Sequence, residues 1–317
     1  MPEHAASSDF ASDPFLERQE FIENAFERRF QALLRQAQQC RTWHVVAAVP
    51  GSGKSSGIAD LVLGSGRRKE ADGTTRVPIL AACAPKNTTT ESALGMALTA
   101  AFGVVPPLPW SQRRPWLVHM LARTGVELLI IDDAQDLSLA HLAYLKELTD
   151  NLAAPPYQHR LGLCLVSASE RGVVPLRETL EHREGLLWRQ FRRRLDTERP
   201  YCLVRGHSEE EVREVLAGFE DLYRPQFPAL ALCRWAGSIY QWLTHPALDL
   251  EGSRRVTMDH LARLVTLTLR RAHTVGAPDV DGTILRDAAD LMTLRRAMVT
   301  SVEDEPAAPC RAQVAVG

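Results

Sequence analysis

Two segments of the sequence carry residue types that are suited to phosphate chemistry. The first is Val45–Ser56, VVAAVPGSGKSS, an apolar run that passes through Pro-Gly-Ser-Gly into Lys-Ser. A phosphate site after a strand needs small residues whose backbone N–H groups turn inward, a lysine that reaches the terminal phosphates, and a hydroxyl for a metal ion. This segment supplies all three groups, and it therefore predicts a phosphate-binding loop.

Each residue of the predicted loop can be given a role. Gly51 and Gly53 permit turns with positive φ, Lys54 is the cation, and Ser55 is the expected Mg²⁺ ligand. Ala48 stands where the usual pattern has its first glycine, which weakens the match without removing a chemical group. The alternative is a glycine-rich turn with a solvated lysine. The predicted nucleotide-binding set is Pro50, Gly51, Ser52, Gly53, Lys54, Ser55 and Ser56.

The second segment is Val126–Gln135, VELLIIDDAQ, in which an apolar strand ends in two adjacent aspartates. A P-loop enzyme needs one carboxylate near its Mg²⁺ and a second that polarises the attacking water. Asp132 is assigned the metal role, together with Ser55, and Asp133 the catalytic one. A solvated acidic turn is the alternative for one carboxylate, but the pair together with an upstream phosphate loop predicts a nucleotide and Mg²⁺ site.

The elements that must position these residues follow from the apolar pattern. Apolar runs alternate with helical spacing, which predicts a parallel sheet with helices on both faces. The expected strands are His44–Val49, Val77–Cys83, Glu127–Asp132, Leu161–Ser167 and Tyr201–Val204. The expected helices are Lys54–Leu63, Glu91–Phe102, Arg114–Thr124, Leu139–Asn151 and Val174–Glu181, after an amphipathic lead-in at Phe15–Gln39.

The character of the chain changes at Ser208, where SEEEVREVLAGFEDLY opens with a Ser-x-x-Glu capping pattern and helical spacing follows to about Ala297. We therefore expect four parts. These are a flexible N-terminus at 1–14, an α/β nucleotide-binding domain with its lead-in at 15–205, a helical domain at 206–300, and a flexible tail at 301–317.

Composition limits the remaining function classes. The 317 residues carry a net charge of −2, so contact with nucleic acid requires a local basic patch. The six cysteines are scattered, and no stretch approaches 18 uninterrupted apolar residues. These features predict a cytoplasmic protein that does not span a membrane.

The motifs together resemble the AAA+ ATPases. The resemblance rests on the P-loop, the Asp-Asp-Ala-Gln strand end, the polar strand end LCLVSASER, the arginine-rich WRQFRRR and the helical region after it. Within that class, VELLIIDDAQDL at 126–137 and LVSASER at 165–171 are similar in placement to the TnsC/TniB group of transposition-regulator ATPases. The resemblance implies ATP as the cofactor and a helical lid.

The resemblance also implies roles for single residues. Ser169 stands where the family has a polar sensor, although it could simply cap the following helix. Arg189, Arg192 and Arg193 lie where the family has the arginine finger of a neighbouring subunit, or else form a solvated helix face. Gln241 replaces a second sensor arginine, and Asp133 replaces the glutamate of many relatives. Both departures imply slow hydrolysis that serves as an assembly switch.

DNA contacts are expected between the second strand and the acidic strand, where the relatives hold duplex DNA inside a ring or helical filament. The candidates are Lys86, Thr88, Arg113 and Arg114, which suit phosphate contact without base reading, although these loops could equally be solvated. The basic run Arg67–Lys69 lies in a hairpin-like loop and is interpreted as a surface feature.

The preferred hypothesis is an ATP-dependent regulator of DNA transposition. It oligomerises on duplex DNA and links a target-selection protein to a transposase. The first alternative is an AAA+ protein of the replication-initiator or helicase-loader type, which shares the Asp-Asp strand end. A P-loop kinase and a nucleotide-switch scaffold are the remaining alternatives.

Overall fold

The computed structural model describes residues 22–71, 73–104, 109–169, 172–249 and 252–292. The predicted flexible segments at 1–14 and 301–317, and the first residues of the predicted lead-in, lie outside these ranges. The described residues divide into two compact units, a sheet unit at 29–204 and a helical unit made of residues 22–28 and 205–292.

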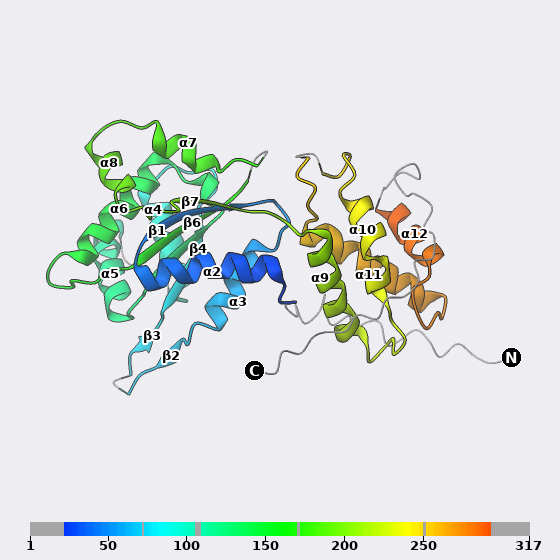
Figure 1. Cartoon of the computed structure of the whole chain (residues 1–317). Helices are drawn as coiled ribbons and strands as arrows, with labels where there is room; N and C mark the ends of the chain where they lie inside the picture. The colour runs from blue at the N-terminus through cyan, green and yellow to red at the C-terminus, as the bar shows by residue number, and fades with distance from the viewer. Residues whose placement is uncertain (1–21, 72, 105–108, 170–171, 250–251, 293–317) are drawn as a thin grey trace. The chain divides into compact units, whose positions relative to one another are not determined.

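The sheet unit is built on five parallel strands in the order β4-β5-β6-β1-β7 (Figure 1). The strands are β1 (Trp43–Ala48), β4 (Ile79–Cys83), β5 (Leu128–Asp132), β6 (Gly162–Ala168) and β7 (Tyr201–Val204). Every residue of β1 and β5 is buried, as expected for strands covered on both faces. A separate antiparallel hairpin pairs β2 (Arg68–Lys69) with β3 (Thr75–Arg76).

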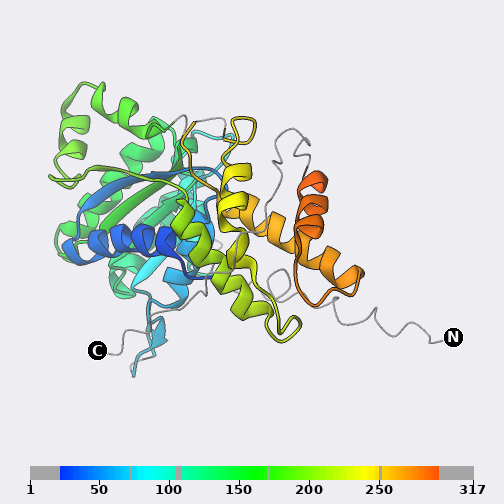
Figure 2. The same ribbon diagram turned by 45° about the vertical axis from the view of Figure 1, so that its right-hand side comes forward.

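Helices cover both faces of the sheet. One face packs against helices that share a hydrophobic cluster with it, and these are α4 (Glu91–Ala101), α5 (Trp110–Arg123) and α6 (Leu139–Ala153). The face turned to the viewer in Figure 1 carries α2 (Ala25–Cys40) and α3 (Lys54–Leu63), and the turned view of Figure 2 also shows α2 along the sheet. The remaining elements are the 3-10 helix η2 (Ala134–Asp136) and the short helices α7 (Pro175–Glu181) and α8 (Leu186–Arg192).

One glycine sets how closely α2 approaches the sheet. A Cβ atom on Gly162, the first residue of β6, would lie 2.2 Å from the carbonyl oxygen of Ala37 in α2. No side chain fits that gap, so only glycine allows this contact without a backbone shift. The contact lets α2 pack closely against the start of β6.

The predicted sheet and its helices are confirmed. All five expected strands form, four with shifts of one or two residues at an end, and the strand at Tyr201–Val204 and helix α3 have the predicted bounds. The helix expected at Arg114–Thr124 begins four residues earlier, at Trp110, and Pro115 lies inside it, where its ring removes one backbone N–H from the second turn. The hairpin expected around Arg67–Lys69 is also present.

The helical unit contains a core of its own. Its elements are α9 (Glu209–Tyr223), η3 (Leu232–Trp235), α10 (Ala236–Leu243), α11 (Met258–Thr274) and α12 (Gly282–Leu291). The predicted capping box is confirmed at α9, where the Ser208 hydroxyl accepts from the Glu211 amide and the Glu211 carboxylate accepts from the Ser208 amide. Phe219, Leu261 and Leu264 are fully buried in this core.

Part of the predicted lead-in belongs to a different compact unit from the one that was expected. It was expected to belong to the nucleotide-binding domain, but its residues up to Arg28 cluster with the helical unit. Packing explains the difference, because Ile22 lies against Gly218 of α9, Phe26 faces the His207 ring, and Arg28 pairs with Glu214. The rest of α2 belongs to the sheet unit.

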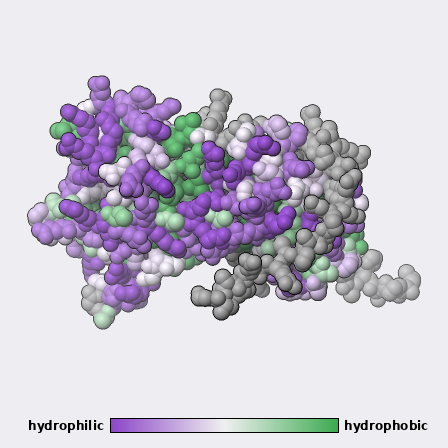
Figure 3. All heavy atoms as spheres, in the orientation of Figure 1, coloured by the Kyte–Doolittle hydropathy of each residue, from purple (hydrophilic) through white to green (hydrophobic). Residues whose placement is uncertain are grey.

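The described surface is mostly polar, as expected when apolar side chains are buried in the two cores. On the face shown in Figure 3, mainly hydrophilic residues cover the described parts of the chain. Among the described residues, we find no helix with the length and hydropathy needed to span a bilayer.

Core packing gives the first prediction. We expect Leu163→Ala in β6 to lower the free energy of unfolding by about 2–5 kcal/mol, because Leu163 is fully buried and its removal leaves a cavity. The matched control is Leu63→Ala at the end of α3, where the side chain is 84% exposed and the change should be close to zero. Urea titrations followed by tryptophan fluorescence would measure both, and equal midpoints would contradict the assignment of β6 to the core.

Candidate nucleotide site

The loop between β1 and α3 has the geometry of an anion cradle. Gly51 and Gly53 take positive φ values of 74° and 101°, as predicted, and Gly53 is the N-cap of α3. Lys54, the first residue of α3, is only 8% exposed. Its Nζ lies 3.3 Å from the Ala48 carbonyl oxygen and 3.4 Å from that of Val49, so the lysine folds back over the loop.

Burial leaves the Lys54 ammonium poorly solvated. It lowers the pKa of Lys54 below its ordinary value, while the charges of Asp132 and Asp133 act to raise it. A phosphate bound in the cradle would give the ammonium the anionic partner that it lacks in the loop itself. The exposed Ser55 and Ser56 follow on the first turn of α3.

The second predicted segment meets this loop directly. The Ser55 hydroxyl donates to Asp132 Oδ2 at 2.6 Å, and the Asp133 amide donates to Asp132 Oδ1 at 2.9 Å. Asp132 ends β5 and is buried. The structure thus brings together the two residues that the sequence assigns to the metal.

Asp133 occupies a strained position beside this pair. Its φ is 53°, in the left-handed region that non-glycine residues seldom adopt, and it caps the short helix η2. The exposed Lys86, from the loop after β4, lies 3.4 Å from its carboxylate. Lys86 was predicted to contact DNA, and that role stays a prediction; in the structure its ammonium lies beside the catalytic candidate.

Gln135 is a functional candidate that the sequence analysis missed. Its side-chain amide donates to Asp133 Oδ1 at 3.3 Å, and its carbonyl oxygen accepts from the Ala168 amide at the end of β6 at 3.0 Å. Gln135 therefore ties the acidic strand end to the neighbouring strand end. The sequence did contain a feature that could have identified Gln135. It is an amide side chain two residues beyond the acidic pair, and the carboxyl ends of parallel strands meet at that level of a sheet.

Three buried serines stand near the ends of β1 and β6. Ser52, Ser167 and Ser169 are each at most 4% exposed, and their hydroxyls have no hydrogen-bond partner among the described residues. The Ser169 amide donates to the Ala48 carbonyl at 2.9 Å, which holds the predicted sensor beside the strand that leads into the loop. Buried hydroxyls without partners are costly unless a ligand or water satisfies them. With Lys54, Ser55 and Asp132, they form a donor set that fits a triphosphate and Mg²⁺.

The arginine-rich segment divides into internal and exposed side chains. Phe191 of α8 is fully buried and packs edge-on against Trp43, with 4.9 Å between ring centroids, so it anchors the helix. Arg192 Nη1 donates to three carbonyl oxygens, those of Leu180 and Arg183 at 2.8 Å and that of Glu181 at 3.3 Å.

Arg192 is therefore used within its own subunit, where it closes the turn between α7 and α8. Arg189 and Arg193 are exposed, and among the described residues neither has an ion-pair partner. Of the three predicted finger candidates, these two remain available to another molecule.

The remaining DNA candidates are engaged or partly covered. The Arg114 guanidinium pairs with Glu147, lies 3.8 Å from Glu91, and sits 5.5 Å above the Tyr144 ring. Arg113 is half-buried beside Met96. Thr88 is half-buried, and its hydroxyl lies 3.2 Å from that of Thr90.

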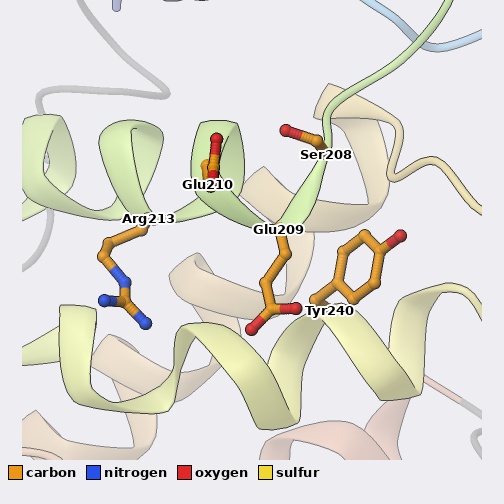
Figure 4. A pocket seen from close by; sticks show the side chains of 5 residues that line it. All are labelled: Ser208, Glu209, Glu210, Arg213 and Tyr240. Atoms are coloured by element: carbon orange, nitrogen blue, oxygen red, sulfur yellow. The ribbon is translucent and has the colours of Figure 1, made fainter.

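The helical unit has a polar pocket of about 610 Å³, lined by Ser208, Glu209, Glu210, Arg213 and Tyr240 (Figure 4). Glu209 and Arg213 extend from α9 towards the helix that carries Tyr240. The Tyr240 hydroxyl donates to the Arg254 carbonyl at 2.8 Å. Gln241, the next residue of α10, is exposed, and the role expected for its position stays a prediction.

Comparison with known proteins supports the fold. Residues 38–170 match the family model described as an AAA domain. No curated protein sequence matches the chain.

Several solved structures share the architecture at low sequence identity. Cdc6p from Pyrobaculum aerophilum is 13% identical with a TM-score of 0.57, over 84% of this chain and 67% of that one. ORC2 from Aeropyrum pernix, solved as ADPNP–ADP complexes, is 13% identical with a TM-score of 0.56, over 86% and 70%. ORC1 from the same organism, solved in complex with DNA, is 14% identical with a TM-score of 0.55, over 89% and 69%.

The chain thus has the P-loop AAA+ fold predicted from its motifs, and it spans about two thirds of the length of these structures. At 13–14% identity, the likeness to these Cdc6 and ORC structures shows the shared fold.

The contacts of α8 give the second prediction. Arg192→Ala should lower the free energy of unfolding by about 1–3 kcal/mol, because three carbonyl oxygens lose their donor. Arg193→Ala, one residue further on, should change it by less than about 0.5 kcal/mol. Chemical denaturation of both variants would measure the free energy of unfolding. Equal losses would contradict the assignment of Arg192 to internal hydrogen bonds and of Arg193 to the surface.

Proposed function

We propose that this chain is a DNA-binding AAA+ ATPase in which bound ATP controls the assembly of several copies on duplex DNA. The observation that carries the proposal is the contact between Ser55 Oγ and Asp132 Oδ2 at 2.6 Å, beside a buried Lys54. This contact places the metal-binding carboxylate beside the phosphate loop. The initiator-like fold and the solved DNA complex of a similar protein support the DNA-binding part.

Each residue of the site has a definite task in this scheme. When bound, ATP would supply the phosphoryl group for transfer to water, with Mg²⁺ to neutralise its charge. Lys54 and the amides of Gly51 to Ser55 would hold the phosphates, and Ser55 and Asp132 would hold the metal. Asp133 would accept a proton from the attacking water, and Ser169 would orient that water.

The contacts of Asp133 favour slow turnover. Lys86 and Gln135 both engage its carboxylate, so an attacking water must compete with them for the same oxygens. A site of this kind holds ATP for long periods, which suits a switch for assembly.

Assembly would complete the site. An arginine supplied by a neighbouring subunit stabilises the charge that develops during phosphoryl transfer. Arg189 and Arg193 are exposed on or next to α8 and suit this role, whereas Arg192 is bound internally. Many copies can hold DNA through few cations each, because weak contacts add along a filament or ring.

Two more specific functions differ in how they select DNA. The fold similarity favours an AAA+ protein of the replication-initiator type. The motifs VELLIIDDAQDL and LVSASER favour a TnsC/TniB-like regulator of DNA transposition, with a transposase and a target-selection protein as partners. Selection from a random duplex pool separates them, because an initiator should enrich a sequence and a coating regulator should not.

The third prediction concerns nucleotide control of DNA binding. Wild-type protein should bind a labelled random-sequence duplex at least about tenfold more tightly with ATP than without nucleotide, and Lys54→Ala should lose that difference, because the phosphates lose their buried cation. Fluorescence anisotropy with ATP, ADP or no nucleotide would measure it. Lys146→Ala, which removes a lysine paired with Asp150, is the control and should retain the ATP effect. Absence of DNA binding under every condition would refute the proposal.

The fourth prediction concerns the arginine finger. Arg193→Ala, or Arg189→Ala if that residue acts, should lower ATP hydrolysis by about a thousandfold while nucleotide affinity is retained. Mixing that variant with Lys54→Ala should restore part of the activity, because the Lys54→Ala subunit still carries its own arginines. Steady-state hydrolysis assays at several mixing ratios would measure this. No recovery with either arginine variant would argue against a finger acting between subunits.

A further inference from the structure

A second pocket lies at the amino ends of the strands, whereas the nucleotide loop lies at their carboxyl ends. The pocket has a volume of about 300 Å³ and is lined by Arg41, Trp43, Thr149, Ala153, Arg160, Leu161 and Arg194. Trp43 begins β1 and Leu161 precedes β6, whereas the nucleotide loop follows the other end of β1. The pocket is therefore separate from the nucleotide site.

Three of the lining side chains are arginines held in different ways. The Arg194 guanidinium stacks 5.1 Å from the Trp43 ring centroid, pairs with Asp150, and donates to the Thr149 hydroxyl at 2.7 Å. Arg41 lies 3.5 Å from Glu127, and its Nη1 atom is shielded from solvent without an acceptor among the described residues.

Arg160 is exposed and has no ion-pair partner within the described part of the chain. Two of the three guanidiniums are thus fixed in position by the fold, and the third is free to turn.

The carboxylates at this end of the strands do not balance the cations. Glu127 is shared between Arg41 and Arg76, and it also accepts from Gln38. Asp150 is shared between Arg194 and Lys146. Four cationic side chains, Arg41, Arg76, Lys146 and Arg194, therefore share these two carboxylates, and Arg160 adds a fifth cation without an ion-pair partner among the described residues.

The positive charge of this cluster affects the pKa of Lys146. Burial lowers the pKa of Lys146, and the charge of Arg194 lowers it further, against an opposing effect of Glu147. An anion placed among these cations would relieve their mutual repulsion.

We propose that this pocket binds a phosphoryl group carried by a small molecule. Guanidinium groups present paired N–H donors that match the oxygens of a phosphate, and Thr149 adds a hydroxyl beside them. Trp43, Ala153 and Leu161 give the pocket an apolar wall, and its volume lies at the lower end of the range of small-molecule sites. A long duplex backbone needs an open groove instead of a pocket of this size.

The proposal does not depend on the proposed function. Its test uses inorganic pyrophosphate as the probe and isothermal titration calorimetry as the measurement. The titrations are done without Mg²⁺ in a Lys54→Ala background, so that the nucleotide loop lacks its lysine. We expect one pyrophosphate per chain, and an affinity about tenfold lower when Arg160→Ala is added, because one charge-assisted contact is lost. Arg160 is exposed, so its removal should leave the fold intact.

The matched control is Arg123→Ala in the same background. Arg123 is also an exposed arginine of the sheet unit, but it does not line the pocket, so its removal should leave the affinity unchanged. A similar loss in both variants would show a general charge effect and overturn the proposal. So would absence of pyrophosphate binding, or unchanged affinity in Arg160→Ala.

Two further measurements distinguish this pocket from DNA binding. A short duplex that binds through Arg160, in a protein that does not bind pyrophosphate, would assign the cluster to the nucleic-acid backbone and refute the small-molecule site. Arg160→Ala on the wild-type background should retain ATP-dependent DNA binding. The two proposals can therefore fail separately.

Discussion

The contact between Ser55 and Asp132 is the constraint on which the nucleotide site depends. The two residues lie 77 positions apart: Ser55 lies on α3, after the loop that follows β1, and Asp132 ends β5. Strands β1 and β5 are not neighbours, because β6 lies between them in the sheet. Their meeting therefore requires the correct strand order and the correct register of two parallel pairings. At the other end of the strands, Gly162 pairs with Leu128 of β5, and its lack of a side chain allows α2 to approach the start of β6.

The same site concentrates groups that do not stabilise the fold. Buried serine hydroxyls without partners, a desolvated lysine and an aspartate with positive φ each carry a cost in free energy. The rest of the sheet unit offsets this cost, because β1 and β5 are buried along their whole length. Such a distribution is expected where a site is built for a ligand that supplies the missing partners.

The sequence predicted those parts of the molecule that depend on local patterns. Strands, helices and the glycines of the loop follow from apolar spacing and from backbone freedom, and they were found close to their predicted bounds. The strand order, the bridge made by Gln135 and the pairing of Lys86 with Asp133 depend on contacts across the sheet, which no spacing encodes. The membership of Ile22–Arg28 was missed for the same reason, because it is decided by packing against α9.

The structure separates the arginines that are bound internally from those that are exposed, which the composition of the segment does not do. In WRQFRRR the charges look alike, but Phe191 is drawn into the core and thereby fixes the orientation of α8. Arg192 is then directed to the carbonyls that end α7, and Arg194 to Asp150 and Trp43. Arg189 and Arg193 have no such partners among the described residues. In a chain whose net charge is −2, cations left unpaired on the surface are the ones available for contact with another subunit or with a phosphate.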